Sequence, residues 1–245
     1  MSARELNGSD TQSDTAQGIG ALAHDALRQM IISGELPAGQ EFSQSELSRR
    51  ISVGRTPLRD ALRLLEREGL VVNTGPHRSV RISPLTMQDL DDLYSMRVMG
   101  ESVAIWLTVP ILRGSDFERL ERDLELTSTG DAEAHRRFHA GLRVGAGPRL
   151  ISHLQTLFDH AERYQRARLA QEPHERMAAA LAEHRFILDA CLARDRVRAR
   201  DLIVDHIAAT AEALMTEARH APYTLPTAIT MAKAGSVPST TSADV

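Results

Sequence analysis

The chain contains a single cysteine, Cys191, and a single lysine, Lys233, among its 245 residues. One cysteine excludes an internal disulfide framework, which agrees with a reducing compartment. Long apolar runs are also missing, because stretches such as 103–109 are too short and too interrupted to span a bilayer. The polar segment MSARELNGSDTQSD at the start lacks the apolar core of a secretion signal. We therefore expect a cytoplasmic protein that has no membrane partner.

The sequence has no glycine-rich loop of the kind that binds phosphates, and no serine, histidine and aspartate arrangement typical of a nucleophile elbow. Its composition, 42% apolar and 25% charged, is that of a globular protein with enough length for two cores. The net charge of −4 means that any affinity for nucleic acid must come from a local cluster of positive charge.

Apolar residues mostly recur at three- and four-residue spacing, which predicts a mostly α protein. The exception is 70–83, LVVNTGPHRSVRIS, where two β-branched runs flank Asn-Thr-Gly-Pro and predict a small hairpin. The polar residues 1–17 and the Pro-, Thr- and Ser-rich residues 221–245 are predicted to be disordered tails. The predicted domains are therefore 18–84 and 85–220.

Three helices are predicted before the hairpin, at 19–33, 43–51 and 55–68. Ser43 and Glu46 have the spacing of a capping box at the start of the second helix. Pro57 falls in the first turn of the third helix, where its missing N–H has no cost. Three helices followed by a hairpin is the layout of a winged helix-turn-helix, a DNA-binding fold.

In that fold the start of the third helix enters the major groove, where arginine can donate two parallel hydrogen bonds to guanine. The predicted DNA-binding residues lie on this helix, at the end of the preceding one and on the wing: Arg49, Arg50, Arg55, Thr56, Arg59, Arg63, His77 and Arg78. Residues 19–83 carry nine arginines against seven acidic residues, a charge of only +2. A solvated arginine-rich face would explain that count but not the clustering at the helix start and the wing.

Residues 26–71 contain G-x-L-x-x-G, an S-E-L helix, V-x-R-T-P-x-R-x-A-L and L-E-x-E-G-L. This combination resembles the DNA-binding domain of the GntR family of bacterial transcription regulators, and the match continues to about Pro84. The resemblance implies a homodimer that binds short inverted repeats of operator DNA. The sequence departs from the family at Gly54, where a serine or threonine is usual, and at Ser79, where a glycine is common.

The second domain is predicted to be a bundle of helices at 87–109, 115–128, 131–144, 148–170, 175–193 and 195–218. Helical spacing places four histidines on inward faces: His135 and His139 on one helix, His184 on another and His206 on a third. A single inward histidine is usually a core residue with a hydrogen-bond partner. Four in one bundle, two of them at i and i+4, favour a metal site.

The pattern F-H, E-H and H-I, formed here by His139, Glu183-His184 and His206-Ile207, resembles the FCD effector domain of FadR-type GntR regulators. The resemblance implies a divalent metal held by one aspartate and three histidines, and His135 occupies the aspartate position. Imidazole in place of carboxylate favours a transition metal such as Zn or Ni over Mg or Mn. The sequence leaves open a metal-free polar pocket, and an oxygen ligand from Asp131, although that residue should cap its helix.

Arg97 and Glu101 share an inward face of the first helix of this domain with Tyr94. An Arg–Glu pair in this order stabilises a helix by at most a few tenths of a kcal/mol. The alternative is that Arg97 binds the carboxylate of a small effector. The predicted effector-binding residues are Tyr94, Arg97, Glu101 and His160.

The leading hypothesis is therefore a dimeric regulator, a repressor, whose helical domain binds a small organic acid and thereby alters DNA binding. Two alternatives remain: a metalloenzyme that uses the four histidines, and a regulator for which the metal itself is the signal. Against the enzyme, Glu183 is the one acidic residue near the histidines with a clear general-base position, and the DNA-binding half would have no role.

Overall fold

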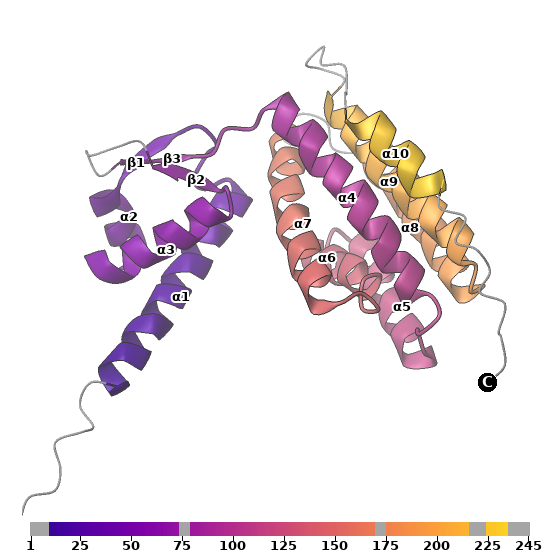
Figure 1. The fold of residues 1–245 in the computed structure, drawn as a ribbon, viewed down its shortest axis with the longest axis horizontal. Helices are drawn as coiled ribbons and strands as arrows, with labels where there is room; N and C mark the ends of the chain where they lie inside the picture. Colours follow the sequence, from indigo (N-terminus) through magenta and orange to yellow (C-terminus); the bar gives the residue numbers. More distant parts are fainter. Residues whose placement is uncertain (1–9, 74–78, 170–174, 216–223, 235–245) are drawn as a thin grey trace, which may run out of the picture. The chain divides into compact units, whose positions relative to one another are not determined.

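The computed structural model describes residues 10–73, 79–169, 175–215 and 224–234. The chain divides into two compact units, Met1–Leu85 and Thr86–Val245, and each is described by itself. The predicted mostly α class is confirmed, since helices form most of the described chain and the strands are confined to one small sheet (Figure 1). In the described ranges no helix is both long and apolar enough to cross a membrane.

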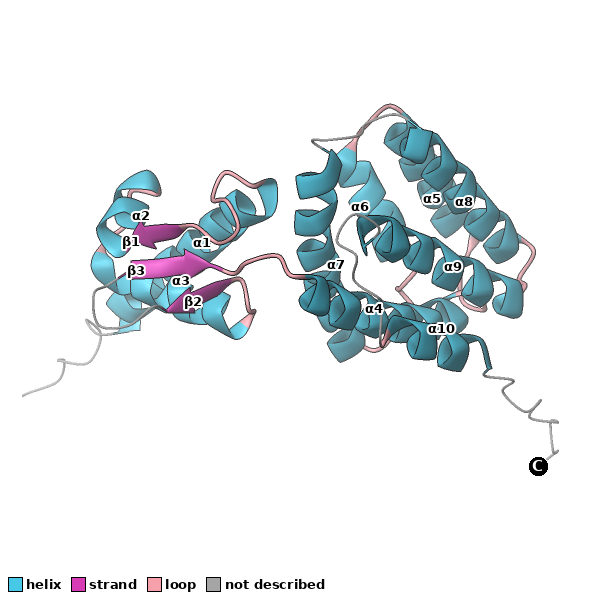
Figure 2. Cartoon of the chain, turned by 90° about the horizontal axis from the view of Figure 1, so that it is seen from above, coloured by secondary structure: helices cyan, strands magenta, loops and turns pink. Residues whose placement is uncertain are grey.

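The first unit contains three helices and a three-stranded sheet. In chain order the elements are α1 (Asp10–Ser33), β1 (Glu41–Ser43), α2 (Gln44–Arg50), α3 (Arg55–Arg67), β2 (Val71–Asn73) and β3 (Ser79–Ile82). The strands are antiparallel in the order β1-β3-β2, and Figure 2 shows them side by side next to the helices. The hairpin predicted over 70–83 is thus confirmed as β2 and β3, while its turn, 74–78, lies outside the described residues.

One apolar core joins the helices to the sheet in this unit. Leu27 of α1, Leu47 of α2 and Leu58 and Leu65 of α3 are buried together with Phe42 of β1. Half of the predicted capping box of α2 is present: the Ser43 side chain accepts a hydrogen bond from the Glu46 backbone N–H at 3.1 Å, while the Glu46 carboxylate is bound by Arg50. Gly34 and Gly69 follow α1 and α3 closely and have positive φ angles, as helix-terminating glycines do.

Two predictions for this unit need correction. Residues 1–17 are not a disordered tail throughout, because α1 begins at Asp10 instead of residue 19. These polar residues have no apolar periodicity that could predict a helix, but a helix nucleated further along the chain extends through them at little cost. Strand β1 was also missed, since three residues are too few to show an alternating pattern.

The second unit is a bundle of helices, in which α4 lies beside α10 (Figures 1 and 2). Its elements are α4 (Met87–Thr108), α5 (Gly114–Ser128), α6 (Ala132–Gly141), α7 (Pro148–Leu169), α8 (Glu175–Leu192), α9 (Arg196–Met215) and α10 (Leu225–Ala234). Helix α4 packs against α7, α9 and α10, while α8 packs against α5 and α9. The first six helices confirm the predicted bundle, with ends that differ from the expected ones by three residues or fewer.

Helix α10 contradicts the prediction that residues 221–245 are disordered throughout. Leu225, Ala228 and Ala232 are buried at helical spacing where α10 packs on α4 and α9. The buried carboxylate of Asp91 accepts the backbone N–H groups of Thr224 and Leu225 at 2.8 and 3.0 Å, and so satisfies the start of the helix. The small alanines and the surrounding Pro and Thr residues hid this short pattern in the sequence.

Candidate functional site

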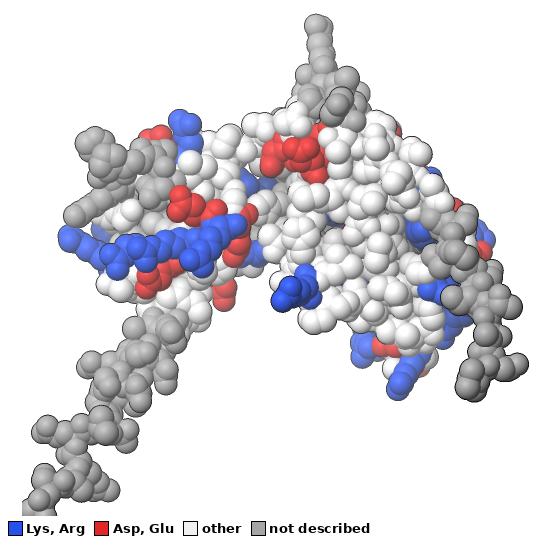
Figure 3. Space-filling model, in the orientation of Figure 1, with Lys and Arg blue, Asp and Glu red and all other residues white. Residues whose placement is uncertain are grey.

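The exposed face of α3 carries a row of arginines. Arg55, Arg59 and Arg63 follow one another at four-residue spacing and are all exposed, while Leu58 and Leu65 on the opposite face are buried. In Figure 3 the basic side chains form a continuous band over α3. The nearest acid to this row is Asp60, whose carboxylate lies 3.8 Å from Arg63 Nη1. The predicted recognition helix therefore presents positive charge to solvent.

The other predicted DNA-binding residues are exposed wherever the structure describes them. Thr56 is exposed in the first turn of α3, and Arg49 and Arg50 are exposed at the end of α2. Arg50 Nη2 donates to Glu46 at 2.9 Å, so part of its charge is compensated within α2. The wing residues His77 and Arg78 lie outside the described residues.

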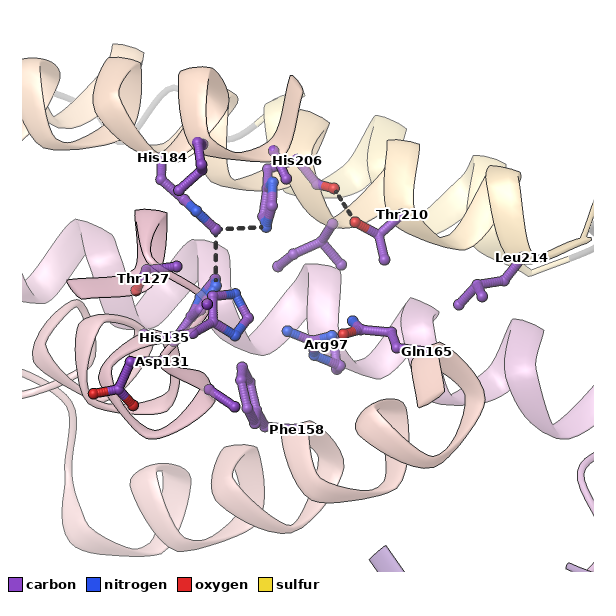
Figure 4. A pocket seen from close by; sticks show the side chains of 16 residues that line it. Arg97, Thr127, Asp131, His135, Phe158, Gln165, His184, His206, Thr210 and Leu214 are labelled. Atoms are coloured by element: carbon purple, nitrogen blue, oxygen red, sulfur yellow. Dashed lines mark hydrogen bonds between the residues drawn. The ribbon is translucent and has the colours of Figure 1, made fainter. Parts of the chain in front are cut away.

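The second unit encloses a cavity of about 290 Å³ between six of its helices. Five of the predicted site residues, Arg97 and the four histidines, are among those that line it (Figure 4). The complete lining is Arg97, Thr127, Gly130, Asp131, Ala132, His135, His139, Phe158, Gln165, Ala180, Leu181, His184, His206, Ile207, Thr210 and Leu214.

The four imidazoles meet at one end of this cavity. His139 Nε2 lies 3.1 Å from His184 Nε2, which lies 3.2 Å from His206 Nε2. In the described chain the ligand atoms of His135, His139 and His184 all lie within 4.8 Å of one another. His206 joins this group through His184, and its other ring nitrogen, Nδ1, lies 2.6 Å from Glu183 Oε2. We call these four residues the imidazole cluster.

Local structure explains why these side chains converge. His135 and His139 are one turn apart on α6, which follows the N-cap residue Asp131, and Phe138 between them packs into the core. His184 lies on the buried face of α8 with Leu188. On α9 His206 is buried, while Ala209, three residues further along, is exposed. Three helices therefore bring their inward histidines together from positions far apart in the sequence.

Burial lowers the pKa of three imidazoles of this cluster, those of His135, His139 and His184, and keeps them neutral. The pKa of His135 falls from 6.5 to about 4, first because burial disfavours the charged ring and then because His206 and Arg97 would repel it. The pKa values of His139 and His184 are also lowered well below their ordinary range, by burial and by neighbouring imidazoles. Neutral imidazole is the form that binds a metal ion.

The geometry of the cluster fits a shared cation. Two nitrogens bound to one ion at about 2.0–2.1 Å lie about 2.9 Å apart at a right angle and about 3.3 Å apart at the tetrahedral angle. The Nε2 separations of 3.1 and 3.2 Å fall within that range. The residues present therefore suit a metal ion.

Asp131 is not placed to supply an oxygen ligand. Its Oδ1 accepts the backbone N–H groups of Glu133 and Ala134 at 2.9 and 3.0 Å, which makes it the N-cap of α6. Figure 4 shows its carboxylate apart from the imidazoles, at the rim of the cavity. In the described structure it is therefore the His135 imidazole, and not an Asp131 oxygen, that lies next to the other histidines of the cluster.

Arg97 lies next to the imidazole cluster and is poorly paired. Its side chain is 3% exposed, yet Nη2 is 3.6 Å from Glu101 Oε1, too far for a hydrogen bond. Glu101 is bound instead by Arg143, whose Nε donates to Oε2 at 2.9 Å. The Nε atom of Arg97 has no hydrogen-bond partner in the described chain. A buried guanidinium with a free donor, facing a cavity, is suited to bind an anion.

The other three predicted effector-binding residues do not line the cavity. Glu101 lies behind Arg97, and the ring of Tyr94 lies 5.2 Å from the Arg97 guanidinium carbon. His160 is also absent from the lining. Spacing correctly predicted inward-facing residues, but it could not tell which of them reach the cavity and which pack behind those that do.

Sequence reasoning missed several residues of the cavity wall, above all Phe158 and Gln165 of α7. Phe158 is buried, and its ring lies 5.3 Å from the Arg97 guanidinium carbon. Gln165 Nε2 donates to the Tyr94 hydroxyl at 3.3 Å. The buried positions Leu154, Phe158 and Ala161 have the spacing of an inward helix face, and that signal could have identified this wall.

The lowered histidine pKa values predict that the metal-free protein is sensitive to acid. The unfolded chain takes up protons at His135 and His139 below about pH 6.5, whereas the folded chain does not until far lower pH. Because the unfolded state then binds more protons, the free energy of unfolding should fall as the pH drops from about 6.5 towards 4. Thermal unfolding of chelator-treated protein at about pH 7.5 and about pH 5 checks this. An equal loss of Tm in His135→Leu would contradict the role given to His135.

Two family models match the chain. The model described as bacterial regulatory proteins, gntR family, matches residues 21–76, and the model described as FCD domain matches residues 92–209. The first match covers the second half of α1, all of α2 and α3, and the arginine row of the first unit. The second covers α5 to α8 and most of α4 and α9, and therefore includes the whole imidazole cluster and Arg97.

Curated relatives cover most of the chain. A transcriptional regulator in an unstable DNA locus of Streptomyces ambofaciens is 31% identical over 80% of this chain and 85% of that protein. The regulator YdhC of Bacillus subtilis is 28% identical over 75% of this chain and 85% of its own length. The transcriptional repressor GlaR of Escherichia coli is 27% identical over 74% and 89%, respectively.

Solved structures share the fold. E. coli McbR/YncC superposes with a TM-score of 0.72 at 17% identity, over 81% of this chain and 98% of that one. A putative GntR regulator from Rhodococcus sp. RHA1 gives 0.66 at 21% identity, over 82% and 99%. The gntR model matches the first unit and the FCD model matches the second unit. The curated relatives that cover most of this chain are transcriptional regulators and not enzymes. The chain therefore belongs to the GntR family of bacterial regulatory proteins and is a transcriptional regulator with an FCD domain.

Proposed function

We propose that this regulator responds to a small organic acid bound in the cavity of its FCD domain, next to a divalent transition metal held by the imidazole cluster. The observation that carries the proposal is Arg97, a buried guanidinium whose Nε lacks a partner and which lines the same cavity as the histidines. A buried guanidinium that lies 3.6 Å from its nearest carboxylate and has a free donor is weakly compensated, so an anion that pairs with it binds favourably.

The metal would be held by His135, His139, His184 and His206. Four neutral nitrogen ligands favour Zn or Ni and disfavour the harder ions Mg and Mn. Glu183 supports this set, because a carboxylate 2.6 Å from His206 Nδ1 holds the proton there and leaves the Nε2 lone pair facing the cluster. The bound ion would supply a Lewis acid that attracts an oxygen of the effector carboxylate.

The DNA-binding role rests on the arginine row of α3. Arg55 and Arg59 are in the part of the helix that enters the major groove in winged helix-turn-helix proteins, with Thr56 between them. Arg49, Arg50, Arg63, His77 and Arg78 would add contacts to phosphates or bases. The proposed target is an operator of two short inverted repeats, each bound by one DNA-binding domain of a homodimer.

An apolar face on α4 supports the homodimer. Met96, Met99, Val103 and Leu107 are each 42–49% exposed and recur every three or four residues, so they form a single row along the helix. Figure 3 shows a broad area without charged side chains over α4 and α7. Large exposed apolar faces are typical of protein interfaces, and a second copy of the FCD domain is the partner expected in the FadR-type branch.

A path from the cavity to the start of α4 lies along α7. The Tyr164 hydroxyl lies 2.6 Å from Asp89 Oδ2 and accepts the backbone N–H of Thr86 at 3.2 Å. Thr86 is the first residue of the second unit, and α7 also carries Phe158 and Gln165 of the cavity wall. If the acid binds one conformation of this region more tightly than another, its binding can therefore change the conformation of the segment that joins the two domains.

We expect the protein to act in the cytoplasm as a repressor. Binding of the acid should relieve this repression. The relative GlaR is a repressor, which agrees with this direction. The relatives are regulators, so the proposed metal serves to bind the effector and does not catalyse a reaction.

The variant Arg55→Ala tests the DNA-binding role. It should bind the DNA upstream of its own gene about 10- to 100-fold more weakly than wild type, because a base contact by arginine contributes about 1–3 kcal/mol. Wild-type affinity should also fall steeply with salt, since bound phosphates release counterions. Fluorescence anisotropy measures both effects. The exposed Arg149, in the FCD domain, gives the control Arg149→Ala, and equal binding by the two variants would contradict the assignment of α3.

A further inference from the structure

We infer that the cavity selects an acid with one anionic group and an apolar body, a short monocarboxylate, over dicarboxylates and polyhydroxylated acids. This inference rests on the proposed function, since it describes the ligand of the same cavity. It follows from the charges that surround the cavity and from the chemistry of its walls.

Arg97 is the one guanidinium among the described residues of the lining, and the neighbouring guanidiniums are already compensated. Arg143 donates to Glu101 at 2.9 Å, and Arg136 forms ion pairs with Asp159 and Glu162. The lining also contains Asp131, whose negative charge would repel a second acid group. The proposed ion and Arg97 lie together at the imidazole end of the cavity and would hold one carboxylate between them, so a second carboxylate further along the cavity would remain unpaired.

Away from the imidazole cluster the walls are mainly apolar. Six side chains from four helices provide this surface: Ala132, Phe158, Ala180, Leu181, Ile207 and Leu214. The three neutral polar side chains of the lining besides the histidines are engaged. Gln165 donates to Tyr94, Thr210 Oγ1 donates to the His206 carbonyl at 2.9 Å, and Thr127 Oγ1 donates to the Asp123 carbonyl at 2.7 Å. A carboxylate or several hydroxyl groups placed here would lose water without gaining equivalent hydrogen bonds.

The size of the cavity limits the acid. A volume of about 290 Å³ is at the small end of the range for small-molecule sites. In Figure 4 the Arg97 side chain lies between the imidazole cluster and Gln165, with Leu214 further from the histidines. An acid group at Arg97 would therefore place a short hydrocarbon chain or a single ring along Phe158, Ile207 and Leu214.

Calorimetry on the full-length protein with one equivalent of Zn²⁺ tests the inference. Hexanoate and benzoate should bind at least about tenfold more tightly than adipate and phthalate, which differ from them by one added carboxylate. Citrate and gluconate should bind as weakly as the diacids. Hexanamide, which lacks the charge, should bind weakly to wild type, and Arg97→Gln should reduce hexanoate to the level of hexanamide.

A variant that gains affinity for a dicarboxylate separates a change in selectivity from a loss of binding through unfolding. Leu214 is partly exposed at the far end of the lining, so Leu214→Lys should be tolerated and would supply a second cation. It should shift the preference from hexanoate towards adipate by at least about tenfold. Leu214→Met is the matched control and should keep the wild-type preference.

The outcomes separate this inference from the proposed function. If adipate, citrate or gluconate binds wild type as tightly as hexanoate and loses affinity in Arg97→Gln, the single-acid inference is overturned while an acid effector stands. If no acid of the panel binds in a manner that depends on Arg97, the proposed function fails and the inference fails with it.

Discussion

His184→Ala should lose at least about 100-fold in zinc affinity relative to wild type. Removing a carboxylate that merely orients a metal ligand costs about 10- to 100-fold, and removing a ligand itself should cost more. His184 is central to the cluster, because its Nε2 lies 3.1 Å from that of His139 and 3.2 Å from that of His206. Its loss leaves three imidazoles in the cluster and removes the one that lies within 3.2 Å of both neighbours.

Elemental analysis of the purified protein and zinc titration against a competing chelator measure this effect. His153 is an exposed histidine on α7, and His153→Ala should bind zinc like wild type. Thermal unfolding without metal shows whether the variant still folds. Wild-type zinc content in folded His184→Ala would contradict His184 as a metal ligand, and no metal in either protein would leave the cluster as a metal-free polar pocket.

Arg97→Gln should change acid binding and stability in opposite directions. A two-pronged contact between guanidinium and carboxylate contains two charged hydrogen bonds, so we expect the affinity for the acid to fall by about 100-fold. Without ligand, Arg97 is a buried charge whose Nε lacks a partner. Replacing it with a neutral amide should therefore raise the free energy of unfolding of the unliganded protein by about 1–3 kcal/mol.

Chemical denaturation with and without acid measures both changes. The matched variant is Arg143→Gln, which removes the partner that donates to Glu101 at 2.9 Å. It leaves a buried carboxylate weakly paired and should lower the free energy of unfolding by about 3 kcal/mol. If Arg97→Gln destabilises the unliganded chain as much as Arg143→Gln does, Arg97 is a structural partner of Glu101 and is not reserved for a ligand.

Much of the fold could be predicted from local patterns. Helical spacing, the Ser43 cap and the glycines after α1 and α3 each act over a few residues, so the sequence displays them directly. Strand β1 and helix α10 could not be predicted in the same way. Their stability comes from distant partners, β3 in one case and Asp91 of α4 in the other.

The candidate site also contains some residues that the sequence could predict and others that it could not. Inward spacing alone led to the imidazole cluster and Arg97, because a helix face is a local property. Depth within the bundle is not local: Tyr94 and Glu101 share a face with Arg97 but lie behind the cavity wall. Phe158 and Gln165 reach the cavity from α7, and that depends on how α7 packs against α4.

His135 is the residue whose interpretation the structure changes most. The family pattern leads one to expect aspartate at this position, and the sequence left Asp131 as an alternative source of oxygen. The structure places His135 within the group of ligand atoms that lie less than 4.8 Å apart, and commits Asp131 to the cap of α6. The metal preference proposed above depends on this exchange of a carboxylate for an imidazole.

The proposed link between acid and DNA is tested most directly by operator affinity, measured with zinc present, with and without the acid that binds most tightly. Wild type should bind the DNA upstream of its own gene at least about tenfold more weakly when the acid is present, which corresponds to a coupling free energy of about 1.4 kcal/mol. Arg97→Gln should bind that DNA equally well with and without the acid. The same response in both proteins, or no response in wild type, would contradict an effector site at Arg97.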